Sequence, residues 1–235
     1  MVLRGLAKSR DQANSMLMAG TVFVNEKRLD KPGQQILTDS KIDIKGKIHP
    51  WVSRGGMKLE KAILEYNLDC SLIIALDIGA STGGFTDVLL TKGAKKVYAV
   101  DVGYGQLDWK LRQDKRVVVK EKTNARFLSD QIIKDPLDVM VCDASFISLK
   151  KILPSGLKFL KKNGWLAALI KPQFEVGKGL VGKGGVVRDS NLHKEVISDI
   201  KGWIESEMQM NLLGVVESPI LGPSGNKEFV IVATK

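Results

Sequence analysis

Apolar strand-like runs alternate with helical segments from residue 72 onward, and this alternation constrains the fold more than any other feature. The strand-like runs are 72–78, 95–101, 116–120, 136–143 and 165–171. The helical segments that follow or separate them are 83–93, 105–114, 149–162 and 193–208. Strands and helices that alternate at this spacing form a parallel sheet with helices on both faces. The sequence therefore predicts an α/β fold with a doubly wound sheet.

The end of the chain predicts a different connection. Two apolar runs, 212–219 and 227–235, are joined by the short segment 220–226. A crossover between parallel strands needs about a dozen residues or more, so this segment is too short for one. We therefore expect the sheet to end in an antiparallel hairpin.

The first 48 residues follow another pattern, in which one helix precedes short strands. Ser9 can cap a helix that stops near Gly20, with an apolar face formed by Ala13, Met16 and Leu17. The runs 21–25 and 41–45 alternate apolar and polar residues, as strands do. We expect a small α+β domain at 1–48, a linker at 49–54 anchored by Trp51, and the α/β domain at 55–235.

Charge is spread unevenly between these parts. The net charge is +10, and residues 1–54 hold ten Lys and Arg against five Asp and Glu, which is half of the excess. A positive surplus favours a polyanionic partner, either nucleic acid or an anionic membrane face. Charge alone does not separate a solvated face from phosphate contacts for the clustered basic residues, which are Arg4, Lys8, Arg10, Lys27, Arg28 and Lys31.

Composition argues against several classes of protein. No apolar run reaches the roughly 20 residues that cross a bilayer, and the first residues lack the apolar stretch of a secretory signal. The cysteines are Cys70 and Cys142 and the histidines are His49 and His193, which is too few for a zinc framework. We expect reduced core cysteines, no metal and a cytoplasmic location.

The first strand of the sheet runs into a glycine-rich loop at 79–84. A phosphate-binding P-loop needs Lys-Ser/Thr after its last glycine, where this chain has Phe85, and the dinucleotide fingerprint G-x-G-x-x-G is not matched. S-adenosylmethionine carries an ammonium and a sulfonium and no phosphate, so an acid beside the loop suits it. Asp101 ends the second strand, where a carboxylate can accept ribose hydroxyls. The expected cofactor residues are Asp77, Gly79, Ala80, Ser81, Thr82, Gly83 and Asp101.

Four further charged residues should lie at the same edge. Asp143 and Lys171 each end a predicted strand, and the carboxyl ends of parallel strands share one edge. Lys58 lies on the predicted helix 57–67, and Glu228 lies in the last strand. Each of them alone could form a surface salt bridge, but two lysines and two acids beside a ligand pocket indicate a functional site.

Longer motifs resemble known families. Residues 3–33 resemble an S4 RNA-binding domain, and "HPWVSRGGMKLEKA", "LDIGASTGGFTDVLL", "CDASFISL", "IKPQFEVGKG" and "GPSGNKEF" resemble the TlyA family of haemolysin-like rRNA methyltransferases. That family is similar to FtsJ-type ribose 2′-O-methyltransferases. The resemblance implies a class I, Rossmann-like methyltransferase fold behind an S4 domain, S-adenosylmethionine as cofactor, and ribosomal RNA or ribosomal subunits as partner.

The resemblance also implies roles for individual residues. Lys58, Asp143, Lys171 and Glu228 match the Lys-Asp-Lys-Glu tetrad of the FtsJ type, and 79–83 match its cofactor loop. The expected RNA contacts are Arg4, Lys8, Ser9, Arg10, Lys27, Arg28, Lys31 and Arg54.

A ribose hydroxyl is a poor nucleophile, so the tetrad must align it with the methyl group and help its proton to leave. Lys171 is the expected base, with Asp143 and Glu228 orienting the two lysines. Two rival functions remain, a membrane-active haemolysin and a ribosome-binding factor without catalytic activity.

Overall fold

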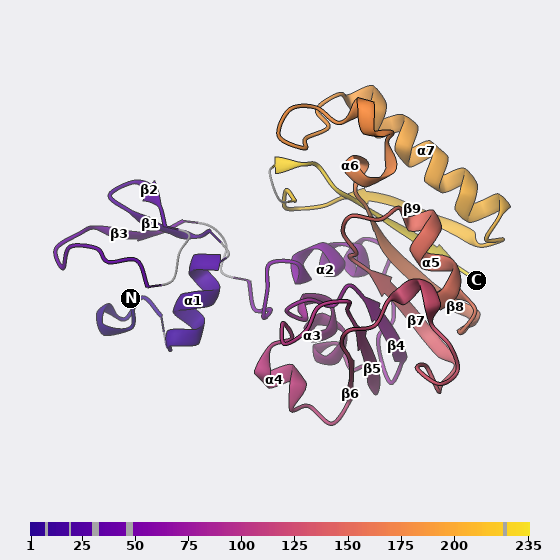
Figure 1. Ribbon diagram of the computed structural model, residues 1–235. Coiled ribbons are helices and arrows are strands. Elements are labelled where there is room, and N and C mark those ends of the chain that lie inside the picture. Colours follow the sequence, from indigo (N-terminus) through magenta and orange to yellow (C-terminus); the bar gives the residue numbers. More distant parts are fainter. Residues whose placement is uncertain (8, 19, 30–32, 46–48, 223–224) are drawn as a thin grey trace. The chain divides into compact units, whose positions relative to one another are not determined.

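The computed structural model describes residues 1–7, 9–18, 20–29, 33–45, 49–222 and 225–235 (Figure 1). Contacts along the chain divide it into two units, Met1–Arg54 and Gly55–Lys235. The predicted linker, 49–54, falls within the first unit, where Trp51 is buried.

The first unit combines one α-helix with a small antiparallel sheet. Its elements are a 3₁₀ turn Val2–Arg4, α1 Arg10–Met18, β1 Val22–Val24, β2 Lys27–Arg28 and β3 Ile42–Ile44, with strand order β2-β1-β3. Helix α1 begins as predicted, because the Ser9 Oγ accepts a hydrogen bond of 3.1 Å from the Gln12 amide. Asn25 and Glu26 both have positive φ, which is the geometry of a tight hairpin turn between β1 and β2.

The core of this unit is small. Ala7, Met16, Leu17 and Val22 are buried together, and Ile42 and Ile44 of β3 pack against them. Arg4 ties the start of the chain to the segment before β3. Its guanidinium donates a 2.6 Å hydrogen bond to the Ser40 carbonyl and another to the Thr38 carbonyl. Much of the hydrogen-bonding capacity of Arg4 is therefore used inside the unit.

The second unit carries the larger sheet and most of the helices. Its strands are β4 Ile74–Ile78, β5 Lys96–Val100, β6 Val117–Lys120, β7 Leu137–Cys142, β8 Leu160–Ile170, β9 Asn211–Glu217 and β10 Phe229–Thr234. Its α-helices are α2 Gly56–Glu65, α3 Gly84–Thr91, α4 Trp109–Arg112, α5 Leu149–Leu157, α6 Pro172–Glu175 and α7 Ser190–Ser206. Two 3₁₀ turns, Ala125–Phe127 and Lys178–Leu180, complete the list.

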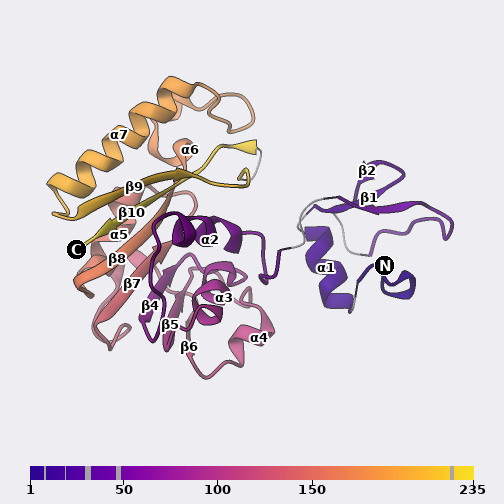
Figure 2. The ribbon, with the colours of Figure 1, turned by 180° about the vertical axis from the view of Figure 1, so that it is seen from behind.

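Within the described residues the strand order is β6-β5-β4-β7-β8-β10-β9. The five neighbouring strands β6, β5, β4, β7 and β8 are parallel, while β10 runs antiparallel to both β8 and β9. The predicted doubly wound sheet with a terminal hairpin is therefore confirmed. Helices α2 and α3 contact each other on one face, and α5 and α7 contact each other on the other (Figures 1 and 2).

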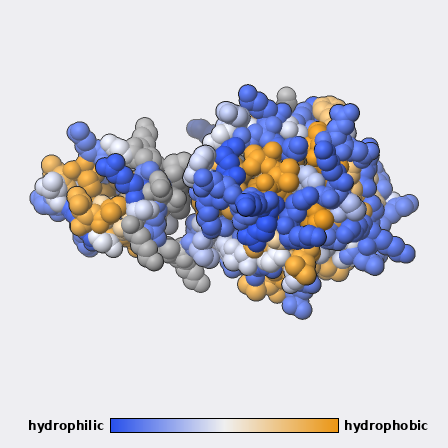
Figure 3. All heavy atoms as spheres, turned by 90° about the horizontal axis from the view of Figure 1, so that it is seen from below, coloured by the Kyte–Doolittle hydropathy of each residue, from blue (hydrophilic) through white to orange (hydrophobic). Residues whose placement is uncertain are grey.

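The sheet centre is apolar on both sides, as the strand sequences require. On the face toward α5 and α7, Leu76, Met140 and Leu166 are fully buried, and each such side chain contributes about 1.5–3 kcal/mol by leaving water. The exterior is different, since the face seen in Figure 3 is largely hydrophilic with apolar patches between the charged side chains. The parallel strands thus form a rigid platform whose carboxyl edge can hold a site.

Several expected element boundaries are wrong, and the helix expected at 105–114 is shorter, since α4 covers only Trp109–Arg112. The segment 149–162 was expected to be helical throughout, but α5 ends at Leu157 and β8 begins at Leu160. Leu160 is buried and pairs with Leu137 of β7, so strand pairing overrides the helical pattern there, and a register shift follows before Trp165. Glu228 was expected inside the last strand, whereas β10 begins one residue later, at Phe229.

Cys70 and Cys142 are free and buried, and burial raises the pKa of the Cys142 thiol to about 12. Within the described ranges, no group of His, Cys, Asp and Glu side chains is arranged to hold a metal ion. In the same part of the chain, no helix has the length and apolar character needed to cross a membrane.

Candidate active site

The loop 79–83 follows β4 at the carboxyl edge of the sheet and approaches the end of β7 closely. Gly79 has φ +77°, and a Cβ atom at this position would lie 3.0 Å from backbone atoms of Asp143 and Ala144. A larger residue would therefore strain the backbone and push the loop away from β7. Glycine keeps the ends of these two strands together, which explains why this loop begins with it.

Asp101 follows β5 and is held by backbone donors. Its Oδ2 accepts a 2.8 Å hydrogen bond from the Ser81 amide, and its Oδ1 accepts one of 2.7 Å from the Gly103 amide. A carboxylate has about four acceptor positions, so two remain for a ligand. The carboxylate thus fixes the glycine loop and also lines the pocket.

Asp77 lies under the same loop and is fully buried. Its Oδ2 accepts a 2.7 Å hydrogen bond from the Thr86 hydroxyl, while its Oδ1 has no hydrogen-bond partner among the described residues. Burial raises the pKa of Asp77 to about 7, with the charges of Asp143 and Asp101 acting in the same direction and the bond from Thr86 opposing them. Asp77 therefore places a buried carboxyl group with a raised pKa below the loop.

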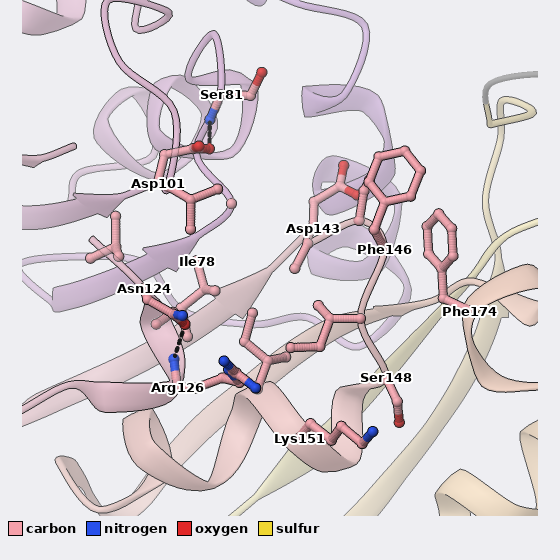
Figure 4. Close-up of a pocket in the computed structure, with 18 of the residues that line it drawn as sticks. Ile78, Ser81, Asp101, Asn124, Arg126, Asp143, Phe146, Ser148, Lys151 and Phe174 are labelled. Atoms are coloured by element: carbon pink, nitrogen blue, oxygen red, sulfur yellow. Dashed lines mark hydrogen bonds between the residues drawn. The ribbon is translucent and has the colours of Figure 1, made fainter. Parts of the chain in front are cut away.

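A pocket of about 960 Å³ opens at this edge (Figure 4). Figure 4 shows Ser81 and Asp101 on one side of it, Asp143 in the middle, and Phe146 with Phe174 on the far side. Of the expected cofactor residues, Gly79, Ser81 and Asp101 line the pocket. The others are not among the described lining residues, namely Asp77, Ala80, Thr82 and Gly83.

The four charged residues expected at the edge do come together. Lys58 Nζ lies 2.7 Å from Glu228 Oε2 and 3.1 Å from Asp143 Oδ2, and Lys171 Nζ lies 2.6 Å from Asp143 Oδ1. They form a continuous series, Glu228–Lys58–Asp143–Lys171, which we call the ion chain. It joins α2, the ends of β7 and β8, and the residue before β10.

The ion chain is largely shielded from water. The side chains of Glu228, Lys171 and Lys58 are 0%, 6% and 8% exposed, and that of Asp143 is 19% exposed. Burial alone would lower the pKa of Lys58, but the charges of Asp143 and Glu228 outweigh it and raise that pKa above its ordinary value. Lys58 is therefore held as a cation, and Asp143 is the member of the chain that lines the pocket.

Glu228 fits against a residue without a side chain. A Cβ atom on Gly222 would lie 2.1 Å from Glu228 Oε1, which is far inside contact distance. The same segment is tied by Asn226, whose side chain accepts from the Val187 amide and donates to the Gly185 carbonyl. The turn before β10 thereby fixes the carboxylate that holds Lys58.

The expected RNA contacts have mixed surroundings. Arg4 binds backbone carbonyls and Ser9 caps α1, so both have structural roles. Arg10 and Lys27 are exposed, and the Arg28 guanidinium lies close to Gly20. Arg54 is half-buried, and the predicted contacts at positions 8 and 31 lie outside the described residues.

Several pocket residues were not identified from the sequence. Ser145, Phe146 and Phe174 line the pocket directly after β7 and β8, and the rings of Phe146 and Phe174 lie 5.0 Å apart. Arg126 and Lys151 lie on its lower wall in Figure 4. A signal was available for the first three, since residues that follow parallel strands collect at the ligand-binding edge.

The strand order, the glycine loop, the acid after β5 and the antiparallel terminal hairpin together define an α/β methyltransferase fold. The model of the family described as FtsJ-like methyltransferase matches residues 51–235. The chain belongs to this family.

Relatives match over nearly the whole chain. YqxC of Bacillus subtilis, named as an rRNA methyltransferase candidate, is 47% identical, covering 98% of this chain and 82% of its own length. The 16S/23S rRNA (cytidine-2′-O)-methyltransferase TlyA of Mycobacterium tuberculosis is 43% identical, covering 98% and 86%. A solved structure of a hemolysin candidate from Streptococcus thermophilus is 44% identical, with a TM-score of 0.81 and coverage of 98% and 84%.

Proposed function

We propose that this protein transfers a methyl group from S-adenosylmethionine to a ribose 2′-hydroxyl of ribosomal RNA. The observation that carries the proposal is the buried ion chain, which reaches the wall of the same pocket that the glycine loop and Asp101 border. Relatives named for rRNA methylation, one of them for cytidine 2′-O-methylation, support the reaction and the substrate class. We infer a cytoplasmic location from this substrate.

The residues of the pocket suit this cofactor. Asp101 keeps acceptor positions for two ribose hydroxyls, and the unpartnered Oδ1 of Asp77 adds negative charge below the loop, which favours a cationic ligand. A volume of about 960 Å³ is ample for a molecule of this size. When bound, the cofactor supplies a methyl group on a sulfonium, which is a good leaving group.

The ion chain would act on the ribose hydroxyl that accepts the methyl group. As the bond between the ribose oxygen and the methyl carbon forms and the sulfur–carbon bond breaks, the hydroxyl proton must leave, and neutral Lys171 would take it. Lys58 is an unsuitable base because its pKa is raised, so its role is to hold Asp143, which in turn orients Lys171. Glu228 would in turn hold Lys58.

Ribosomal subunits are the direct test of this proposal. Methylated nucleotides would resist alkaline cleavage after incubation with the protein and a tritiated methyl donor, and Lys171→Ala should lose the signal while Lys162→Ala, an exposed lysine, keeps it. Label found on a base, or no label on RNA with the intact protein, would refute the proposal.

We propose further that residues 1–48 are an S4-type RNA-binding domain and that 49–54 link it to the methyltransferase domain. The basic surplus of this region supports phosphate binding, in which each lysine or arginine contact contributes about 0.7–0.9 to the slope of log affinity against log salt.

Changing Arg10 and Lys27 to Gln should flatten that slope by about one to two units, because both side chains are exposed. Arg4 is a poor probe, since it holds the backbone at Ser40. Filter binding across a salt series measures the slope, with Lys158→Gln/Lys162→Gln in the second unit as the matched control. An equal slope in both double variants would assign RNA binding to the second unit.

The name of the Streptococcus thermophilus structure suggests a second function, membrane lysis. A liposome-leakage assay distinguishes membrane lysis from methyl transfer, and the Lys171→Ala variant, which breaks the ion chain, makes the assay more specific. Lysis by both the intact protein and Lys171→Ala would show an activity independent of the ion chain, whereas we expect neither protein to release dye.

A further inference from the structure

Ser145 contacts the lysine that the proposed reaction depends on. The Lys171 ammonium has three acceptors in reach, Asp143 Oδ1 at 2.6 Å, the Ser145 hydroxyl at 2.9 Å and the Asp143 backbone carbonyl at 3.4 Å. The contacts to the Ser145 hydroxyl and to the Asp143 carbonyl have hydrogen-bond geometry, whereas Asp143 Oδ1 lies at ion-pair distance without a hydrogen bond among the described residues. Since 3.4 Å is at the weak limit, the Ser145 hydroxyl accepts the better of the two hydrogen bonds.

Ser145 also links this ammonium to the pocket wall. Lys171 is 5% exposed and is not among the described residues that line the pocket, whereas both Asp143 and Ser145 line it. Ser145 itself is exposed. The Ser145 side chain therefore contacts both the Lys171 ammonium and the space that a substrate could occupy.

We propose that Ser145 is a positioning residue for Lys171. Its hydroxyl accepts the better hydrogen bond from Nζ and, together with the ion pair to Asp143, fixes the direction in which the amine can present its lone pair to the ribose hydroxyl. Without the hydroxyl the amino group can rotate about its terminal bond, and fewer orientations are productive. This inference rests on the proposed methyl transfer and assigns a role outside the four residues of the ion chain.

The backbone around Ser145 is held firmly enough for this role. Glu175 Oε1 accepts a 2.8 Å hydrogen bond from the Leu149 amide, which ties the loop after β7 to the turn after β8. Phe146 has φ +64°, an unusual conformation for an aromatic residue, and its ring packs on Phe174. The loop that carries Ser145 is thus restrained on both sides.

The test compares Ser145→Ala with Ser145→Thr, which keeps a hydroxyl. The matched control is Ser198→Ala, which removes an exposed hydroxyl from α7. A hydrogen bond to a charged group has a strength that corresponds to about a 10- to 100-fold effect, so Ser145→Ala should lower kcat by this factor. Ser145→Thr should recover most of the activity, and Ser198→Ala should match the intact protein.

A further readout separates positioning from general damage. Cofactor affinity by calorimetry should stay within about twofold in Ser145→Ala, because an effect confined to the transition state leaves ground-state binding unchanged.

The outcomes distinguish this inference from the proposed function. If the intact protein fails to methylate RNA, the proposed function itself is refuted. If the intact protein is active and Ser145→Ala has the same kcat, the role of Ser145 is refuted. Loss of cofactor binding in Ser145→Ala also overturns it, because the hydroxyl would then support the pocket rather than Lys171.

Discussion

The carboxylates at the two ends of the site are held in different ways. At the cofactor end, which comprises the loop 79–83 and Asp101, the carboxylate accepts hydrogen bonds from backbone amides and borders an open pocket. In the ion chain, Asp143 and Glu228 are held by lysine side chains and are mostly shielded from water. Asp101 is thus held by uncharged backbone amides, whereas Asp143 and Glu228 are held by charged lysine side chains.

Under the proposed function, this difference should separate cofactor binding from turnover. Uncharged backbone donors hold the Asp101 carboxylate and leave acceptor positions for neutral hydroxyl groups. A buried series of opposite charges is sensitive to the loss of any member, because the remaining charge is left without its partner. We therefore expect changes at the cofactor end to alter affinity, and changes in the ion chain to alter the rate.

The largest effect should come from Lys171→Ala. Removing a general base lowers turnover by about 100- to 10,000-fold, while Asp143 keeps its contact with Lys58. Cofactor affinity should change by less than about twofold. Single-turnover kinetics measure the rate and calorimetry measures the cofactor affinity. A fall in cofactor affinity as large as the fall in rate would contradict the proposed division between cofactor binding and turnover.

Asp101→Ala should give the converse result. Losing two charge-assisted hydrogen bonds to ribose costs about 3 kcal/mol, or roughly 100-fold in cofactor affinity. Turnover at saturating cofactor should recover in large part. Calorimetry and saturation kinetics measure this, with the exposed Asp130→Ala as the control. Unchanged affinity in Asp101→Ala would exclude this carboxylate from the cofactor site.

Gly222→Ala tests the ion chain without removing a charge. The added Cβ would meet Glu228 Oε1 at 2.1 Å, so the carboxylate must shift and Lys58 must follow. We expect turnover to fall about tenfold with intact cofactor affinity, since modest misplacement of catalytic groups is costly. Gly202→Ala is the matched control, because a Cβ there meets nothing within 4 Å. Equal rates in the two variants would show that Glu228 does not affect the reaction.

The last prediction concerns Asp77 and the effect of pH on stability. Its pKa is raised from 3.8 to about 7 by burial, so the folded protein binds more protons than the unfolded chain between about pH 4 and 7. Stability should therefore decrease as pH rises through that window, by at most about 1.4 kcal/mol for each pH unit. Urea unfolding of the intact protein and Asp77→Asn should differ in slope by this contribution, and parallel slopes would contradict it.

Local patterns predicted most of the fold because they report burial. The apolar runs after residue 72 identified the strands, and parallel strands place their carboxyl ends at one edge. Asp101, Asp143 and Lys171 could therefore be assigned to one site by their positions alone. The boundary at Leu157 could not, because Leu160 pairs with a residue more than twenty positions away, and that pairing outweighs the local helical pattern.

The sequence by itself determined the order of the elements, the edge at which the site lies and the residue types available there. Only the tertiary structure decided which charges meet, because Lys58 reaches both Asp143 and Glu228 through the packing of α2 beside the sheet. It also placed Ser145 against the Lys171 ammonium and turned Arg4 toward the backbone of its own unit. Such contacts join residues far apart in the chain, and their distances depend on the packing of whole elements, which no local pattern encodes.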